Sequence, residues 1–132
     1  MDAKKALGWA GILGASSVLV LALAAHTLET KLDSSQLNAV KTAGNIQLFH
    51  SVALLGLGAS SEKTMVQLGN AIKIMLIGTC LFSFSIYLIM FKSISGFEFL
   101  RFIWPVTPIG GLVLMFSWVM IFVKSRKLGK SN

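Results

Sequence analysis

Charged residues are scarce in this sequence. Of its 132 residues, 13% are charged and 55% are hydrophobic, whereas soluble domains usually carry about a quarter charged residues. So few charges cannot cover a surface that faces water. The five acidic residues all lie outside the apolar runs described below. The sequence therefore lacks the paired buried carboxylates of general acid–base catalysis and the acidic path of many ion transporters.

Cysteine and histidine are also rare. Cys80, the single cysteine, lies within an apolar run, which excludes an intrachain disulfide and indicates a small core residue. The two histidines, His26 and His50, fall at helix depths that differ by roughly 15 Å, too far apart to ligate one haem. The sequence contains no cluster of Cys, His, Asp and Glu residues that would indicate a metal site. We therefore predict no catalytic residue, metal or cofactor, and a protein that is not an enzyme.

Four uncharged stretches make up most of the chain. They cover residues 6–28, 42–61, 74–91 and 102–123, each close to the 20 or so residues with which a helix crosses about 30 Å of hydrocarbon. None alternates polar and apolar residues as a strand of a membrane barrel does. We predict one all-α integral membrane domain, residues 1–132, forming a four-transmembrane-helix bundle with spans at about residues 7–28, 42–60, 73–91 and 105–123.

The first stretch has a second interpretation as a secretory signal peptide. Residues 1–5 contain Lys4 and Lys5, as the start of a signal peptide does, and Ala22-Leu23-Ala24 is typical of a cleavage site. The apolar run of residues 6–28 is longer than the usual signal core of about 7–15 residues. We therefore predict that the first span is retained.

Lysine and arginine set the predicted orientation. Four spans put both termini on one side, and that side collects eight of the twelve basic residues, while Lys31, Lys41, Lys92 and Arg101 lie on the other. Loops rich in basic residues stay inside, so both termini are predicted on the cytoplasmic side of a bacterial inner membrane or the matrix side of a mitochondrial one. The basic residues lie at the ends of apolar runs rather than along one face, which excludes nucleic acid as the partner.

Three segments are predicted near the membrane surfaces. Residues 35–43 form an amphipathic, interfacial start to the second helix. At the last helix, Thr107 is the predicted N-cap and Pro108 the first helical residue. The C-terminal basic residues are predicted to contact anionic lipid headgroups; they are Lys124, Arg126, Lys127 and Lys130.

Polar residues inside the spans usually face other helices, because a lipid-facing polar group is costly. The helical rise of about 1.5 Å per residue groups these residues by depth. One predicted cluster lies in the middle of the membrane and contains Gln47, His50, Ser83 and Ser17. A second lies near the outer end and contains His26, Tyr87 and Thr107. Within the first, His50 is either a proton-relay or ligand position or a neutral imidazole that holds helices in register.

Small residues recur along one face of the first span. Residues Gly11, Ala15, Val18, Ala22 and Ala25 form this small-residue seam. Small side chains let helix backbones approach closely in membranes. The seam therefore predicts close packing against another helix.

Motifs in the four spans resemble those of a known family. They are residues 32–55 around His50, Ala24-Ala25-His26, Phe82-Ser83-Phe84-Ser85-Ile86-Tyr87, and Thr107-Pro108-Ile109-Gly110-Gly111 with Trp118. In this order they resemble the small membrane family catalogued as domain of unknown function 423, which includes eukaryotic transmembrane protein 256. The resemblance extends from about Gly8 to Val123 and implies a four-helix inner-membrane protein without implying an activity. Leu21-Ala22-Leu23-Ala24 and Ile46 depart from the family pattern.

Three functions are compatible with this sequence. A small bundle with many small and aromatic residues and no acidic path favours a structural or accessory subunit of a larger membrane complex, such as a respiratory one. Its expected partners are the lipid bilayer and other membrane subunits or a second copy. The alternative is a small transporter or channel that uses the polar cluster around His50. An enzyme or a quinone-binding module is the least favoured.

Overall fold

The structure is a computed structural model that describes residues 1–96 and 103–128. Within those residues the regular structure is helical. The elements, in chain order, are α1 (Ala3–His26), a short 3-10 helix η1 (Leu28–Thr30), α2 (Ser34–Gly58), α3 (Glu62–Ser95) and α4 (Val106–Leu128). The prediction of an all-α chain with four long helices is confirmed.

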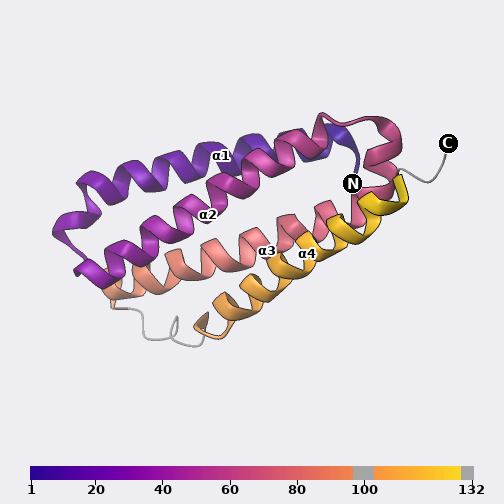
Figure 1. Cartoon of the computed structure of the whole chain (residues 1–132). Helices are drawn as coiled ribbons and strands as arrows, with labels where there is room; N and C mark the ends of the chain where they lie inside the picture. The colour runs from indigo at the N-terminus through magenta and orange to yellow at the C-terminus, as the bar shows by residue number, and fades with distance from the viewer. Residues whose placement is uncertain (97–102, 129–132) are drawn as a thin grey trace.

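The four long helices run alternately up and down, and each packs mainly against its neighbour in the chain (Figure 1). α1 and α2 form one hairpin, α3 and α4 form another, and α2 lies against α3. Two contacts bring the chain ends together: the space beside Gly69 on α3 is filled by the backbone of Met1, and Lys124 on α4 bonds to Gln67. The start of α1 and the end of α4 therefore lie at the same end of the bundle.

Local signals explain most helix ends. The Asp2 carboxylate accepts the Lys5 backbone N–H at 2.8 Å and starts α1. Asp33 and Gln36 form a reciprocal capping box at the start of α2, which satisfies two otherwise free amide groups. α3 ends at Gly96, whose φ of +76° suits a residue without a Cβ.

The start of α4 differs from the prediction. The helix begins at Val106, so Thr107 is not its N-cap and Pro108 lies inside its first turn. The Thr107 hydroxyl instead shares a hydrogen bond with that of Ser85 on α3 at 2.7 Å. Pro108 is tolerated there because the first amides of a helix have no intrahelical acceptor.

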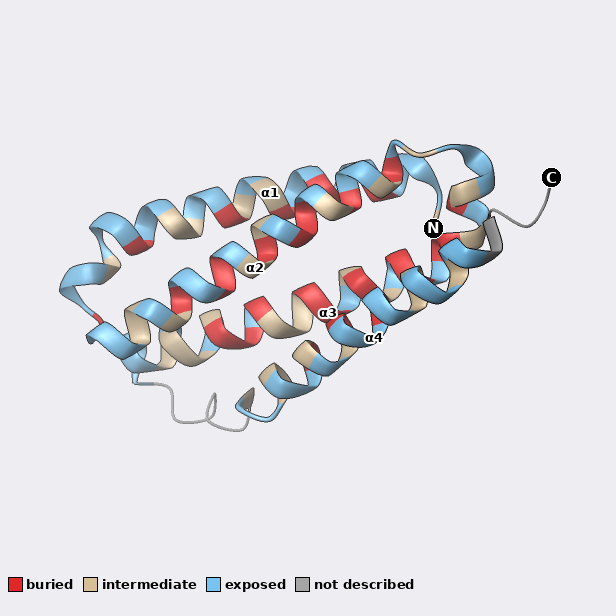
Figure 2. Ribbon diagram, viewed as in Figure 1, coloured by how far each residue is buried: buried red, intermediate tan, exposed pale blue. Residues whose placement is uncertain are grey.

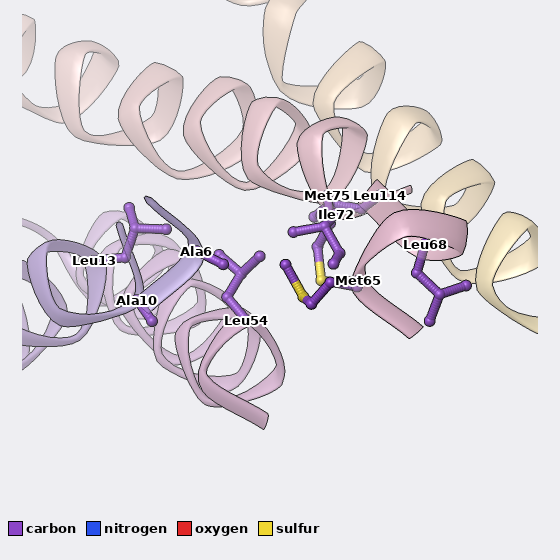
Figure 3. Close-up of a cluster of buried hydrophobic side chains, with 9 residues drawn as sticks. All are labelled: Ala6, Ala10, Leu13, Leu54, Met65, Leu68, Ile72, Met75 and Leu114. Atoms are coloured by element: carbon purple, nitrogen blue, oxygen red, sulfur yellow. The ribbon is translucent and has the colours of Figure 1, made fainter. Parts of the chain in front are cut away.

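The buried core follows the inner faces of the helices (Figure 2). Its larger apolar cluster lies toward the end that holds the start of α1 (Figure 3) and contains residues Ala6, Ala10, Leu13, Leu54, Met65, Leu68, Ile72, Met75 and Leu114. A smaller cluster at the opposite end contains Ala24, Leu32 and Val40. The outer faces carry many large apolar side chains, with Ile12 of α1 and Leu112 of α4 each more than half exposed, so they suit a hydrocarbon solvent better than water.

Three helices of the described chain are long and apolar enough to cross a membrane: α1, α3 and residues Val106–Arg126 of α4. α2 is not among them, although it is as long as α1. Its polar residues, including Lys41, Asn45 and Gln47, lower its hydropathy. What those polar residues contact decides how α2 is interpreted.

Candidate functional site: a polar network between helices

Gln47 is the centre of a buried network that joins three helices. Its side chain is fully buried on α2. The Gln47 amide nitrogen donates to the Leu13 carbonyl at 2.9 Å and to the Ser16 hydroxyl at 2.6 Å, both on α1. On the other side, the Tyr87 hydroxyl of α3 donates to the Gln47 carbonyl oxygen at 3.0 Å. Both amide hydrogens and the carbonyl of Gln47 are thus used inside the protein.

Two buried serines add hydrogen bonds at the same level. Ser17 of α1 donates to the Gly44 carbonyl at 2.8 Å, and Ser83 of α3 donates to the Ala43 carbonyl at 3.1 Å. Both acceptors lie on α2, one turn before Gln47. The structure therefore places Gln47, Ser17 and Ser83 around one stretch of α2.

His50 lies one turn further along α2 and makes a separate pair of bonds. Its Nδ1 is 2.7 Å from the Ile46 carbonyl, and its Nε2 is 3.2 Å from the indole Nε1 of Trp118 on α4. A carbonyl accepts only and an indole N–H donates only, so these partners assign the neutral tautomer with the proton on Nδ1. His50 is thus the side-chain link from α2 to α4.

The structure does not bring His26, Tyr87 and Thr107 together. His26 is exposed at the end of α1, Thr107 pairs with Ser85, and Tyr87 reaches Gln47. Side chains on a helix tilt toward its N-terminus, which for α3 is the direction of the bundle centre. The Tyr87 hydroxyl therefore lies deeper than its Cα, which the depth estimate from helical rise did not consider.

The basic residues at the end of α4 differ from one another. The Lys124 ammonium donates to the Gln67 carbonyl at 3.0 Å, so it is turned toward α3. Arg126 is exposed and lies 5.7 Å from the ring centre of Phe122. The Lys127 side chain and Lys130 lie outside the described residues.

Sequence reasoning missed three partners: Ser16, Ser85 and Trp118. Ser16 directly precedes Ser17, and Ser85 lies two residues after Ser83; in each case only the other serine was predicted to belong to a polar cluster. Trp118 was noted only as part of a motif. The sequence feature that could have indicated its role is an indole N–H donor in the middle of an apolar helix, because such a donor usually needs an acceptor when it is away from water.

The network joins the helices to one another. Every fully buried side-chain nitrogen and oxygen of the described residues has a hydrogen-bond partner within the chain. Across residues 1–96 and 103–128, no group of three or more His, Cys, Asp and Glu side chains is placed to hold a metal ion. The hydrogen bonds of the network are those expected of interhelical contacts in a membrane.

Comparison with known proteins decides the family. The family described as "Protein of unknown function (DUF423)" matches residues 20–111, which include α2, α3 and the network residues that these two helices carry. The chain belongs to this family. The resemblance predicted from the four motifs is confirmed.

Relatives cover nearly the whole chain. It is 32% identical over 120 residues to the "UPF0382 membrane protein SH2409" of Staphylococcus haemolyticus, covering 88% of this chain and 93% of that protein. It is 26% identical over 133 residues to the "UPF0382 inner membrane protein YgdD" of Escherichia coli K12, covering 100% of this chain and 97% of that protein. No solved structure matches. With three helices that can span a membrane, the chain is a multi-pass integral protein of the inner membrane.

Proposed function

We propose that this protein is a four-span packing subunit of a larger membrane assembly. α1, α3 and α4 provide three spans, and we propose that α2 is the additional one. Ser17 of α1 bonds to Gly44 near the middle of α2, and Ser83 of α3 bonds to the adjacent Ala43. At the last residue of α2, Gly58 faces Ala6 of α1. Because α2 lies beside α1 and α3 along its length, it shares their depth in the bilayer.

The polar residues of α2 are compatible with that depth. Gln47 and His50 are satisfied by partners on other helices, and satisfied polar groups are tolerated inside a bundle. Phe49, Val52 and Leu55 face outward, as lipid requires. The exposed Asn38 and Lys41 lie in the first turns, at the predicted interface. Four spans put both termini on the more basic, cytoplasmic or matrix side.

One observation carries the packing role: the small-residue seam of α1 faces away from the protein's own helices. Its members Gly11, Ala15, Val18, Ala22 and Ala25 are all exposed. The face of α1 that packs on α2 is a different one, formed by Ala6, Ala10, Leu13 and Ser17. Seams of this kind favour close approach of a second helix in membranes, and none of the helices within residues 1–96 and 103–128 covers this one.

The glycines of the chain show the same contrast. A Cβ added to Gly11 would meet no atom within 4 Å. A Cβ added to Gly44, Gly58, Gly78 or Gly110 would meet a neighbouring helix at 3.1 Å or less. A glycine inside a helix costs about 1 kcal/mol relative to alanine. The last four glycines are explained by contacts inside the chain. Gly11, like Gly8 and Gly56, has no such contact, and the proposed role assigns it to a helix of another chain.

A transporter built on His50 is less well supported. The described polar groups around it bond to each other and to backbone carbonyls rather than lining an aqueous path. If the protein did transport protons or ions, purified protein in liposomes would show a flux that His50→Ala abolishes. We expect no flux above that of empty liposomes.

The packing role is tested by two matched variants of α1. Ala15→Trp places a bulky side chain on the seam, and Ile12→Trp places one on the neighbouring face, where Ile12 is 59% exposed. After mild detergent extraction of native membranes, native electrophoresis and mass spectrometry should show the wild type and Ile12→Trp in one larger complex. Ala15→Trp should migrate at the size of the lone chain. Migration of the wild type as a lone chain would contradict the proposal.

A further inference from the structure

An apolar groove of about 150 Å³ opens on the side of the molecule at the end away from the chain termini. The last turns of α1, the η1 segment, α2 and α3 all contribute to it. Its lining includes residues Val20, Leu28, Leu32, Val40, Tyr87 and Phe91. This end of the bundle holds the smaller core cluster, so the groove is a shallow gap over that core.

The groove has a buried floor and an exposed rim. Val40 and Leu32 at the floor are 2% and 8% exposed, whereas Leu23 and Phe91 at the rim are 42% and 54% exposed. The hydroxyl of Tyr87, the one polar side-chain group among the lining residues, is bonded to Gln47. An apolar groove whose one polar side-chain group is already bonded favours an apolar guest over water.

The loop over the groove is held by its own hydrogen bonds. The Leu32 and Lys31 amides both donate to the Leu28 carbonyl, at 2.9 and 3.0 Å. The Thr30 hydroxyl donates to the Thr27 carbonyl at 3.0 Å. Leu28 and Leu32 are therefore fixed over the groove, and an occupant does not have to order them first.

The depth of the groove identifies a hydrocarbon chain as its occupant. α1 crosses the membrane and ends at His26, so the η1 segment lies at the membrane surface. Val20 is six residues before His26, which places it about 9 Å below that surface. At that depth a dry apolar groove that is open at the side is adjacent to lipid acyl chains.

Two opposite charges lie in the sequence between the groove residues Leu28 and Leu32. Glu29 and Lys31 are exposed in the same segment as Leu28 and Leu32. Neither belongs to an ion pair within residues 1–96 and 103–128, whereas the Asp33 carboxylate there is occupied by the Gln36 amide. A carboxylate next to an ammonium is complementary to a headgroup with a phosphate and a primary amine.

We propose that this groove is a binding site for a zwitterionic phospholipid of the phosphatidylethanolamine class, in the leaflet on the side of the α1–α2 loop. One acyl chain lies between Val20, Val40 and Tyr87. Lys31 bonds to the phosphate and Glu29 to the ammonium group. The site is separate from the seam of α1, so it does not depend on the packing role.

Photo-crosslinking in phosphatidylcholine nanodiscs tests the site. The probes are phosphatidylethanolamine and phosphatidylglycerol, each with a diazirine on one acyl chain, and adducts are mapped by peptide mass spectrometry. The wild type should give adducts on the groove residues, with about two- to fivefold more from the ethanolamine probe, as one exposed ion pair allows. Equal labelling of the groove by both probes would overturn the headgroup assignment.

Two kinds of variant make the result specific. Val20→Phe fills the groove, whereas Val52→Phe adds the same side chain to an exposed position outside both the groove and the seam. Groove adducts should be lost in the first and kept in the second. Glu29→Lys, a surface change that leaves the core intact, should reverse the preference toward phosphatidylglycerol. Groove adducts that persist in Val20→Phe, or a preference unchanged by Glu29→Lys, would contradict the proposal.

Discussion

The two helical hairpins are joined by different means. In α3–α4 the contact is backbone against backbone: a Cβ on Gly110 would lie 2.5 Å from the Phe82 nitrogen, and one on Gly78 would lie 2.9 Å from the Leu114 nitrogen. In α1–α2 the corresponding glycine, Gly44, faces the Leu21 side chain. There the middle of the interface is joined by hydrogen bonds from Gln47 and Ser17.

This difference shows two ways to hold helices together in lipid, where the hydrophobic effect does not drive them together. Close backbone packing gains dispersion contacts and tolerates no added atom. Hydrogen bonds tolerate changes of shape but need both partners. The α1–α2 hairpin, with the polar network, should therefore be sensitive to loss of polar groups. The α3–α4 hairpin should be sensitive to added volume.

The largest effect is expected at Gly110. Gly110→Ala places a methyl group against the backbone of α3, which cannot move aside as a side chain can. We expect a loss of about 3 kcal/mol in the free energy of unfolding, measured by SDS titration in mixed micelles. The control is Gly111→Ala, where the nearest atom is a Phe82 ring carbon at 3.7 Å. Equal losses in the two variants would contradict the backbone contact.

The next effect is expected at the network. Gln47→Leu removes three hydrogen bonds and leaves the Tyr87 hydroxyl without its acceptor. At about 0.6 kcal/mol for each bond, the loss is about 2 kcal/mol. Asn45→Leu changes an exposed amide two residues away on the same helix and should not destabilise. If Asn45→Leu were the more harmful of the two, α2 would face the other way.

A smaller effect is expected at Gly44. Gly44→Ala would press on the end of the Leu21 side chain at 2.8 Å, and that side chain can change rotamer. We expect a loss of about 1 kcal/mol in the same titration. The informative quantity is the ratio of the loss in Gly44→Ala to the loss in Gly110→Ala. A loss at Gly44 as large as that at Gly110 would remove the distinction between the two hairpins.

The smallest effect concerns pH and the start of α1. The backbone N–H of Lys5 and the nearby Lys5 ammonium lower the pKa of Asp2 from its usual 3.8. A lowered pKa means that the cap stabilises the helix above pH 3.8 and that this is lost as the pH falls through the lower folded value. The hydrogen-exchange protection of the first turn of α1, corrected for intrinsic rates, should therefore fall as the pH drops below 3.8. In the Asp2→Ala variant the protection of this turn should be low at every pH.

The helices themselves could be predicted because lipid imposes a simple rule on composition. Long uncharged runs must be helical in a bilayer, and four such runs gave four long helices. Their ends were less predictable. α3 begins at Glu62, well before the predicted third span at residue 73, because Ser61 caps it and its first turns place Met65 and Leu68 in the larger buried cluster.

The polar network was predictable in part. The depth of Gln47, Ser17 and Ser83 follows from helical rise alone, and the structure places all three around the same part of α2. Tyr87 was grouped with His26 and Thr107 rather than with Gln47, and Trp118 was given no partner, because helical rise gives the position of a Cα and not the reach of a long side chain. The outward direction of the α1 seam was also hidden, since small residues favour packing without indicating which chain supplies the partner.

The central claim is that α2 crosses the membrane, and labelling of single cysteines from each side tests it most directly. In a Cys80→Ser background, cysteines at Ser34, Ser61 and Ser131 report the α1–α2 loop, the α2–α3 loop and the C-terminus. Four spans predict that an impermeant maleimide added to right-side-out membrane vesicles labels position 34 alone. Inside-out vesicles should then label positions 61 and 131. Labelling of positions 34 and 61 from the same side would show that α2 does not cross, and would contradict the account.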